Sequence, residues 1–542
     1  MKKYMLFLLV CIVFFSTGLS PVEAKQAPSQ TVYHDISTSY AKEAILRLTK
    51  RNIVSGNGAG AFLPRNKVTR AEMATMMSRL LQMNPVDNDI SAFRDVPEQA
   101  WYYGWVHAGT NLGIIHGRSE RLFKPIDPVT RQEAAVMMVR AMKVDASTGE
   151  EIVYRRYEDA AELAAWSRAA VGVATLHGWL QGSGGKFRPH DPITREEVAV
   201  LMDRILYDGN VIDVLNRVND PAFANNASEI QMGWLYNGTT KQYISYAKTS
   251  GINTLVPRWY YIESTGNVSD ETDIELLNWA QNNGRKVWAM LGNRSNAEIT
   301  HKVLSDSTAR RKVITKLAAY VKKYKLDGIN VDFENVIPED RSYLTSFIQE
   351  LSTELHKQGA VISIDVSPDL GTDWTAAFDY KALGRYADYV VLMGYDEHWG
   401  GSPKAGSVSS LPWLAAAVDK LLTQVPASKS VIALPLYTRE WRINPVVSSE
   451  EISLTQQGQR IRSSSTSLVW NHWLGQYEAG YVKGGIDRRI WTEDARSLSM
   501  KHNMLADRNP AGYAYWYVGS ETPDVWQAIM NMERYKSYMF DI

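Results

Sequence analysis

Cysteine is almost absent from this chain of 542 residues: the single one, Cys11, lies within the first two dozen positions. Disulfides therefore cannot hold the fold together, and its stability must come from apolar cores. Hydrophobic residues make up 45% of the chain and charged residues 22%, which is typical of globular proteins and excludes a disordered chain. The length allows about two to four domains.

The chain also has no formal net charge and few long apolar runs. The 59 basic and 59 acidic residues cancel, so a general electrostatic surface for nucleic acid is not expected. After Lys2 and Lys3, residues 4–15 are all apolar or aromatic, and residues 22–24 (Val-Glu-Ala) fit a cleavage site. This pattern predicts a secretory signal peptide over residues 1–24, too short to span a bilayer, and no later run predicts a transmembrane anchor.

One unit occurs three times in the first half of the chain. The segment Val-Thr-Arg-Ala-Glu at 68–72 returns as Val-Thr-Arg-Gln-Glu at 129–133 and Ile-Thr-Arg-Glu-Glu at 193–197. Upstream of each segment, an aromatic residue is followed by a glycine sixteen positions later. These pairs are Tyr40 and Gly56, Trp101 and Gly117, and Trp166 and Gly182. Three copies at one spacing predict a repeat module.

The Thr-x-x-Glu of each segment is a capping box, so each threonine is expected to begin a helix. The next residue is arginine in all three copies, at Arg70, Arg131 and Arg195. It would lie in the first helical turn, where the helix dipole disfavours a cation. Two interpretations stay open: an anionic ligand nearby, or a packing and ion-pair role.

The triplicate pattern resembles the S-layer homology (SLH) domain, with repeats over residues 30–84, 90–145 and 153–206. The resemblance implies an all-α module of three lobes that binds secondary cell-wall polysaccharide in grooves between lobes. It therefore implies a secreted protein attached non-covalently to the bacterial cell wall. The ligand-contacting residues that it implies are Arg70, Arg131, Arg195, Gly56, Gly117, Gly182, Trp101 and Trp166.

A second domain is expected over residues 229–542, after a turn-rich linker at 207–228. Eight short apolar runs there alternate with helical patterns, which predicts an α/β (β/α)8 TIM barrel. The expected strands are 231–236, 253–257, 286–291, 328–333, 361–366, 389–393, 431–436 and 512–516. The long gap before the eighth strand requires an insertion.

The fourth run carries ionisable groups where a buried strand is normally apolar. It reads Asp-Gly-Ile-Asn-Val-Asp-Phe-Glu over residues 327–334. Because side chains alternate along a strand, Asn330, Asp332 and Glu334 are expected to point into the barrel. Two close carboxylates raise one pKa, as a general acid at neutral pH requires. Glu334, nearest the barrel mouth, is the candidate acid; an ion-paired core network or a calcium site is the structural alternative.

The spacing Asp-Gly-x-x-x-Asp-x-Glu resembles the signature of glycoside hydrolase family 18, the chitinase and endo-N-acetylglucosaminidase family. The resemblance implies substrate-assisted retaining catalysis, in which the acetamido oxygen of the substrate attacks C1 to give an oxazolinium. Glu334 would then be the acid and later the base, and Asp332 would orient the acetamido group. Asp327 would brace the strand, and Asn330 stands where chitinases commonly have aspartate. This chemistry requires no metal and no cofactor.

Further matches to the family fall at other strand ends. Met-Gly-Tyr-Asp at 393–396 resembles its sixth-strand motif, which implies that Tyr395 hydrogen-bonds the acetamido oxygen as part of the catalytic set. Segments 396–399, 411–413 and 490–497 look most like the spore-cortex-lytic and cell-wall branch, whose members act on peptidoglycan. The remaining substrate-binding residues that the resemblance implies are Asp327, Asn330, Met393, Asp396, Tyr437, Arg439 and Trp516.

Three functions follow from these motifs. The first is a wall-anchored glycosidase that cleaves β-1,4 bonds at N-acetylglucosamine in peptidoglycan. The second is a chitinase or chitooligosaccharide hydrolase displayed on the cell surface. The third is a non-catalytic sugar-binding protein associated with an S-layer, which the presence of Glu334 disfavours.

The asparagine at position 330 generates a first prediction. Unlike aspartate, asparagine gives Asp332 no ionisable neighbour at this position. Asn330→Asp should therefore shift the pH dependence of the rate at which an N-acetylglucosamine oligomer is hydrolysed. The profile is measured for both proteins across the same pH range. An unchanged profile would show that position 330 does not tune the catalytic pair.

Overall fold

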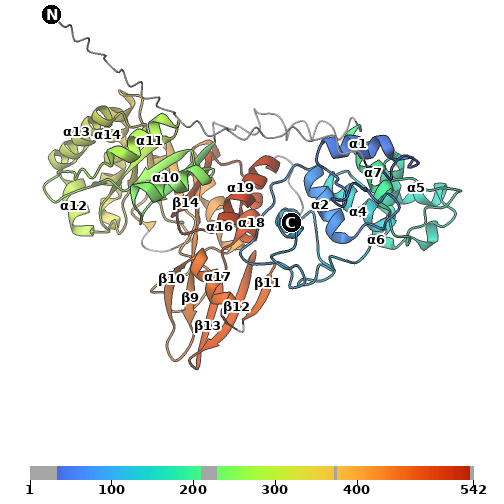
Figure 1. The fold of residues 1–542 in the computed structure, drawn as a ribbon. Coiled ribbons are helices and arrows are strands. Elements are labelled where there is room, and N and C mark those ends of the chain that lie inside the picture. Colours follow the sequence, from blue (N-terminus) through green and yellow to red (C-terminus); the bar gives the residue numbers. More distant parts are fainter. Residues whose placement is uncertain (1–32, 209–228, 372–374, 465, 537–542) are drawn as a thin grey trace, which may run out of the picture.

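A computed structural model of the chain describes residues 33–208, 229–371, 375–464 and 466–536 (Figure 1). The expected signal peptide and nearly all of the expected linker lie outside these residues. The repeats form a helical module, and the second half forms a barrel from which a smaller sheet projects. Within the described residues, no helix is long and apolar enough to cross a membrane.

The repeat module contains seven α-helices and one short 3-10 helix in residues 33–208. The predicted capping boxes are confirmed at Thr69, Thr130 and Thr194, each of which accepts a hydrogen bond from the third residue of its helix. The helices are α1 (Lys42–Lys50), α2 (Arg70–Leu80), α3 (Tyr103–Asn111), α4 (Arg131–Ala141), α5 (Gly149–Arg156), η1 (Ala160–Glu162), α6 (Ala165–Leu176) and α7 (Arg195–Leu206).

A closed ring of backbone hydrogen bonds joins the three lobes. The N–H of Val68 donates to the carbonyl of Ile193, that of Ile193 to Val129, and that of Val129 to Val68, each at 2.9 Å. Isolated antiparallel bridges accompany these bonds, such as Thr69 with Pro128. The prediction of an all-α module is therefore not confirmed in that form, because its centre is built from extended residues just before the capping boxes.

The conserved geometry of the repeats extends to the arginines, each of which reaches into the next lobe. Arg131 donates to the carbonyls of Phe187 at 2.9 Å and Gln181 at 2.8 Å and to Glu197 at 2.6 Å. Its guanidinium also lies over the Phe187 ring, 5.1 Å from the centroid. Arg70 and Arg195 make the matching bonds to the carbonyls of Phe123 and Phe62. The packing and ion-pair interpretation thus has direct structural support.

The second half closes into a parallel barrel with strand order β1-β2-β4-β5-β6-β7-β8-β14, and β14 pairs with β1. The eight predicted strands are confirmed with small shifts at their ends. They are β1 (Ile230–Leu235), β2 (Thr254–Pro257), β4 (Lys286–Gly292), β5 (Gly328–Asp332), β6 (Val361–Val366), β7 (Tyr389–Met393), β8 (Ser430–Pro435) and β14 (Gly512–Trp516). The two-residue strand β3 (Tyr260–Tyr261) pairs with the end of β4.

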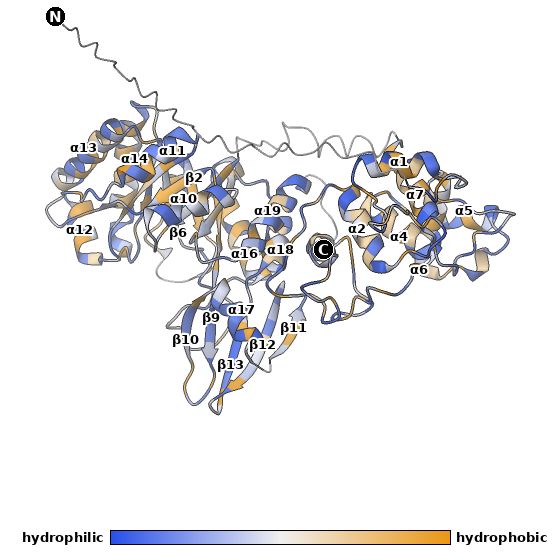
Figure 2. Ribbon diagram, viewed as in Figure 1, coloured by the Kyte–Doolittle hydropathy of each residue, from blue (hydrophilic) through white to orange (hydrophobic). Residues whose placement is uncertain are grey.

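Helices surround the barrel, and those such as α13 and α14 show both hydrophilic and hydrophobic residues in Figure 2, as helices packed on a core require. Each buries one face; in α13, Val313, Leu317 and Val321 are inaccessible or nearly so. The surrounding helices are α10 (Thr240–Thr249), α11 (Ile274–Asn282), α12 (Ala297–Ser305), α13 (Ser307–Tyr324), α14 (Arg341–His356), α15 (Tyr380–Tyr386), α16 (Leu411–Leu422), α18 (Ala495–Ala506) and α19 (Pro523–Tyr535).

The expected insertion between the last two barrel strands is a five-stranded antiparallel sheet of order β10-β9-β13-β12-β11. It projects below the barrel in Figure 1. Its elements are β9 (Tyr437–Arg442), β10 (Ser448–Ser453), α17 (Leu454–Arg462), β11 (Ser467–Asn471), β12 (Gln476–Lys483) and β13 (Ile486–Trp491).

The repeat module packs directly on the second half of the chain through the segment between its first two repeats. Asn84 and Asn531 exchange two hydrogen bonds of 2.8 Å between side chain and backbone. Asp89 accepts from Arg462 at 2.8 Å, and its N–H donates to Asp524 at 3.0 Å. Sequence reasoning did not foresee this interface, which holds the two halves in one orientation.

The buried arginines generate a stability prediction. Arg131→Met should lower the free energy of unfolding by about 3 kcal/mol, because it leaves the Glu197 carboxylate and two carbonyls without their partner. The matched control is Arg155→Met, which also removes an arginine paired with a glutamate but at an exposed site, where little change is expected. Thermal unfolding followed by circular dichroism compares them, and equal midpoints for the two variants would contradict the structural role of Arg131.

Candidate active site and wall-binding grooves

The predicted catalytic residues meet at the carboxyl ends of the barrel strands. Asp332 is the last residue of β5, Tyr395 follows β7, and Trp516 ends β14. The rings of Tyr395 and Trp516 are nearly parallel, with centroids 6.4 Å apart. Tyr437, the first residue of β9, meets Tyr395 edge-on at 6.2 Å. Residues far apart in the sequence therefore form one aromatic and acidic site where barrel enzymes carry out their chemistry.

Asp332 is one acid of the site whose pKa its surroundings raise. Burial and the nearby charge of Glu334 raise the pKa of Asp332 to about 7, and the guanidinium of Arg258 opposes the rise. The sequence predicted that repulsion between the two carboxylates would raise the pKa of one of them, and the pKa that is raised is that of Asp332. A carboxyl that titrates near neutral pH can exist in either protonation state under working conditions.

Asp365 is a third acid that sequence reasoning missed. It lies on β6, 1% exposed, and accepts a hydrogen bond of 2.7 Å from Asn330 Nδ2. Asn330 also donates to Ser363 at 3.0 Å and accepts from Trp234 Nε1 at 3.2 Å, so its amide is fully engaged. Burial and the charge of Asp332 raise the pKa of Asp365 well above its usual range. The signal was present in the alternation of Ser363 and Asp365 along an otherwise apolar strand.

Glu334 is held at the mouth of the barrel by the loop that follows β4. The Asn293 side chain accepts from the Glu334 N–H at 3.1 Å and donates to its carbonyl at 2.7 Å. Ser295 Oγ donates to the Glu334 carboxylate at 2.5 Å. Asn293 is 2% exposed, whereas Glu334 is open to solvent. The backbone of the candidate acid is thus fixed while its carboxyl group stays accessible.

The subsite residues expected on the far side of the site also come together. Tyr437 donates to Asp396 Oδ1 at 2.6 Å, and Asp396 has a left-handed backbone with φ of 64°. Burial raises the pKa of Asp396, while the hydrogen bond from Tyr437 and the charge of Arg439 lower it. Arg439 lies within 3.5 Å of Glu451, a residue of β10 that the sequence did not single out.

Asp327 lies at the opposite end of β5 from the other candidates. Its carboxylate accepts from the Val287 N–H at 2.8 Å and so links β4 and β5 near their amino ends. This contact is consistent with the strand-bracing role that the resemblance implies for Asp327. Asp327 lies away from the other candidate residues. Met393, at the end of β7, packs against the apolar residues inside the barrel.

Arg258 is a further site residue that sequence reasoning missed. It follows β2, and its guanidinium lies 4.4 Å from the centre of the Tyr236 ring. Its Nε is buried and makes no hydrogen bond with the described residues. No motif of the sequence pointed to it, because its importance comes from its place beside Asp332.

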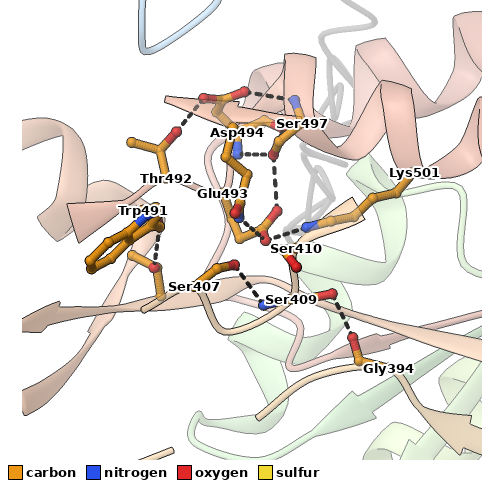
Figure 3. Close-up of polar contacts among 12 residues, drawn as sticks. Gly394, Ser407, Ser409, Ser410, Trp491, Thr492, Glu493, Asp494, Ser497 and Lys501 are labelled. Atoms are coloured by element: carbon orange, nitrogen blue, oxygen red, sulfur yellow. Dashed lines mark hydrogen bonds and ion pairs between the residues drawn. The ribbon is translucent and has the colours of Figure 1, made fainter. Parts of the chain in front are cut away.

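The loop after β7, which carries Tyr395 and Asp396, is anchored by a buried polar network (Figure 3). Ser409 Oγ donates to the carbonyl of Gly394 at 2.7 Å. A Cβ at Gly394 would come within 2.6 Å of the Ala433 carbonyl, so glycine is required for this close approach. On the insertion side, Lys501 and Glu493 form a fully buried ion pair. The bond from Ser409 and the close packing at Gly394 fix the path of the loop and therefore the position of Tyr395.

Three of the repeat residues predicted to bind polysaccharide meet in one groove between lobes. A groove of about 530 Å³ is lined by Gly56 of the first repeat, Trp101 of the second and Arg195 of the third. Trp101 is 61% exposed, so its ring is available to a ligand. Tyr40, which replaces tryptophan in the first repeat, instead lies near Arg131 and Glu197. This groove is therefore assembled from residues of all three repeats.

The glycines of the repeats are required by packing whatever else they contact. A Cβ at Gly56, Gly117 or Gly182 would lie within 2.3–2.5 Å of a backbone oxygen of the same loop. It would also clash with the ring of an aromatic residue near the start of the same repeat, which is Tyr33 for Gly56, Phe93 for Gly117 and Tyr157 for Gly182.

Comparison with known proteins divides the chain in the same way. The sequence profile of glycosyl hydrolases family 18 matches residues 229–521, and that of the S-layer homology domain matches residues 32–74, 92–135 and 156–199. The uncharacterized glycosylase YvbX of Bacillus subtilis (strain 168) is 28% identical over 307 residues, which are 54% of this chain and 87% of that protein.

Two further comparisons concern cortex-lytic enzymes. The cortical fragment-lytic enzyme of Bacillus anthracis is 28% identical over 244 residues, 43% of this chain and 56% of the enzyme, so the match spans about half of that relative. The spore cortex-lytic enzyme SleL of Bacillus megaterium shares the fold, with a TM-score of 0.51 at 20% identity over 56% of this chain and 73% of that one. The chain therefore belongs to glycosyl hydrolases family 18, related to the spore cortex-lytic branch, and carries three S-layer homology repeats.

Proposed function

We propose that the chain is a retaining glycosidase anchored to the cell wall, which cleaves β-1,4 bonds at N-acetylglucosamine in peptidoglycan. The observation that carries this proposal is the arrangement of Asp332, Glu334 and Tyr395 at the barrel mouth. An accessible carboxyl beside one whose pKa is raised, backed by a tyrosine hydroxyl, suits catalysis in which the substrate's own acetamido group is the nucleophile.

In the first step, Glu334 donates its proton to the glycosidic oxygen as the bond from that oxygen to C1 breaks. The acetamido carbonyl oxygen attacks C1 from the opposite face, and the sugar becomes an oxazolinium with a positive charge. Tyr395 donates a hydrogen bond to the acetamido oxygen and aligns it for attack. Asp332 accepts from the acetamido N–H, and its negative charge stabilises the cation.

In the second step, the Glu334 carboxylate removes a proton from water, and the resulting hydroxide forms the new bond at C1. The oxazolinium ring opens, the acetamido group is restored, and Glu334 regains its proton. Two displacements at C1 give net retention of configuration.

The proton balance of the buried acids supports this role for Asp332. Burial and the charge of Asp332 raise the pKa of Asp365 well above its usual range, and the pKa of Asp332 is raised to about 7. Asn330, two residues before Asp332 on β5, donates a hydrogen bond to Asp365 without adding a charge. Asp332 can therefore become anionic when a positive charge develops beside it, which lowers the energy of that state.

The choice of peptidoglycan is supported by the repeats and by the relatives. Curated relatives include cortical fragment-lytic enzymes, and the repeat grooves suit attachment to a secondary cell-wall polysaccharide. Attachment would place the enzyme outside the cell, beside its substrate. Cleavage of chitin or chitooligosaccharides at the same site is the second candidate, since the proposed mechanism requires only an N-acetylated amino sugar.

The first test compares the full chain with Glu334→Gln on two substrates. Because the amide cannot donate the proton, kcat should fall at least about 100-fold on any substrate that the enzyme cleaves. Mass spectrometry of the products identifies new reducing ends from purified peptidoglycan and, separately, from chitooligosaccharides. Muropeptides released by the unaltered chain alone would support the proposal, and cleavage restricted to chitooligosaccharides would favour the second candidate. Turnover that survives in the variant would overturn the role of Glu334.

A second test uses the raised pKa of Asp332. Folding keeps this acid protonated at pH values where the unfolded chain has already lost the proton, so the folded state is disfavoured as pH rises from about 4 to about 7. Asp332→Asn removes this penalty and should be more stable than the unaltered chain at pH 7.5, by about 1–3 kcal/mol. At pH 4 the two proteins should unfold alike.

The measurement is the midpoint of thermal unfolding at both pH values. The same variant should lose at least about tenfold in kcat, since the amide cannot balance the oxazolinium charge. A difference in stability that did not change between pH 4 and pH 7.5 would contradict the raised pKa.

A further inference from the structure

Arg258 is a cation at the mouth of the barrel for which the fold supplies no dedicated counter-charge. It directly follows β2, so it lies at the carboxyl ends of the strands, where the candidate catalytic residues also lie. Within the described residues, its Nε is buried without a hydrogen bond and its guanidinium forms no ion pair. Burying a charged donor without a partner costs free energy, so an anionic group of a ligand is the partner to look for.

Aromatic rings hold this guanidinium in place. It lies 4.4 Å from the centre of the Tyr236 ring and 6.0 Å from that of Tyr261. On the other side, Arg294 lies 3.7 Å from the centre of the Tyr261 ring, but Glu271 is 3.4 Å away from it and supplies a counter-charge. A ring face attracts a cation without accepting its in-plane N–H groups. The donors of Arg258 therefore stay free, in the fork that matches the two oxygens of a carboxylate.

The ring beneath Arg258 belongs to the aromatic wall of the active site. Tyr236 follows β1 and is 39% exposed, and its ring centre lies 5.4 Å from that of Trp516 and 5.2 Å from that of Tyr517. Trp516 is the ring on which the N-acetylated sugar is expected to lie. Arg258 is thus one ring removed from that sugar, beside it rather than beneath it.

The acids around the mouth do not satisfy Arg258. Asp332 is close enough for the guanidinium to oppose the rise in its pKa, but the proposed mechanism commits that carboxylate to the acetamido N–H and to the cation on the sugar. Arg439 on the other side of the mouth is different, because Glu451 lies 3.5 Å and Ser449 3.3 Å from its guanidinium. Of these two arginines, Arg258 is the one that lacks a carboxylate from the fold.

A carboxylate carried by the substrate would supply the missing charge. Chains of N-acetylglucosamine alone have no ionised group. The muramic acid of peptidoglycan bears a lactyl ether that ends in a carboxyl group, which is anionic where no peptide is attached. Where a peptide is attached, the same carbon is part of a neutral amide. A bidentate arginine distinguishes these forms, since only the free carboxylate offers two charged acceptors.

We propose that Arg258 is a specificity-determining residue that binds the free lactyl carboxylate of a muramic acid beside the sugar on Trp516. The inference rests on the proposed function and names the form of peptidoglycan that the site takes, which is the strand without peptides. Such strands arise when water cleaves the amide bond between the lactyl carboxyl and the peptide. An amidase reaction must therefore supply the substrate.

Binding is measured by titration calorimetry on the full chain carrying Glu334→Gln, so that no ligand is consumed. One ligand is a peptide-free oligosaccharide of alternating N-acetylglucosamine and N-acetylmuramic acid, and the other is the same oligosaccharide with its lactyl carboxyls converted to primary amides. The free carboxylate should bind about tenfold more tightly. Adding Arg258→Met should abolish this preference, and Arg258→Lys should retain part of it, because lysine keeps the charge but not the fork. Any effect through Asp332 is common to both ligands and cancels from the ratio.

Arg439→Met is the matched control, since it removes an arginine of the same mouth that already has a carboxylate partner. It should change the affinity for both ligands by the same factor and leave the preference intact. Equal affinity of the Glu334→Gln chain for the two ligands would overturn the proposal. So would a preference that survived Arg258→Met, or one that Arg439→Met abolished as well.

Turnover with Glu334 intact separates this inference from the proposed function. A chain that shows the binding preference but cuts neither oligosaccharide would contradict the hydrolysis and support the carboxylate site. A chain that cuts both forms with equal kcat/KM would uphold the hydrolysis and overturn the role of Arg258.

Discussion

The burial of acidic side chains inside a closed barrel is the constraint on which the active site depends. A carboxylate removed from water is costly unless it is paired, hydrogen-bonded or protonated. Three features bear on this cost: the pKa of Asp365 is raised well above its usual range, Asn330 donates a hydrogen bond to Asp365 from a neutral amide, and Arg258 opposes the rise in the pKa of Asp332. What remains is a single group poised to change charge beside an accessible Glu334. In the proposed mechanism, the stability lost there allows a cation to form on the substrate.

Two buried cations elsewhere in the described residues are paired within the fold. Arg131 in the repeat module and Lys501 on α18 each face a glutamate, away from the barrel mouth. The contrast separates structural ions from catalytic ones. A structural ion has its counter-charge within the fold, whereas in the proposed mechanism the counter-charge of Asp332 is the cation formed on the substrate.

Periodic features were predictable from the sequence, and features created by folding were not. The eight barrel strands and the three capping boxes follow from local patterns. Asp332 and Glu334 do too, because residues two apart along a strand lie on the same side of it. Asp365 was missed because one acid in an apolar strand carries little signal alone. Asn293, Ser295 and Arg258 act from loops whose approach to the site depends on barrel closure. The repeat arginines were ambiguous, since one position in a helix does not reveal the carbonyls of the next lobe.

The contact between Asn84 and Asn531 has a consequence for where the enzyme can work. A catalytic domain tethered only by a flexible connection would search a sphere around its anchor. Here the halves also contact each other through a segment between two repeats. If the proposed function holds, the scissile bond would lie at one distance and bearing from the anchoring polymer, and the architecture of the wall would select which strands are cut.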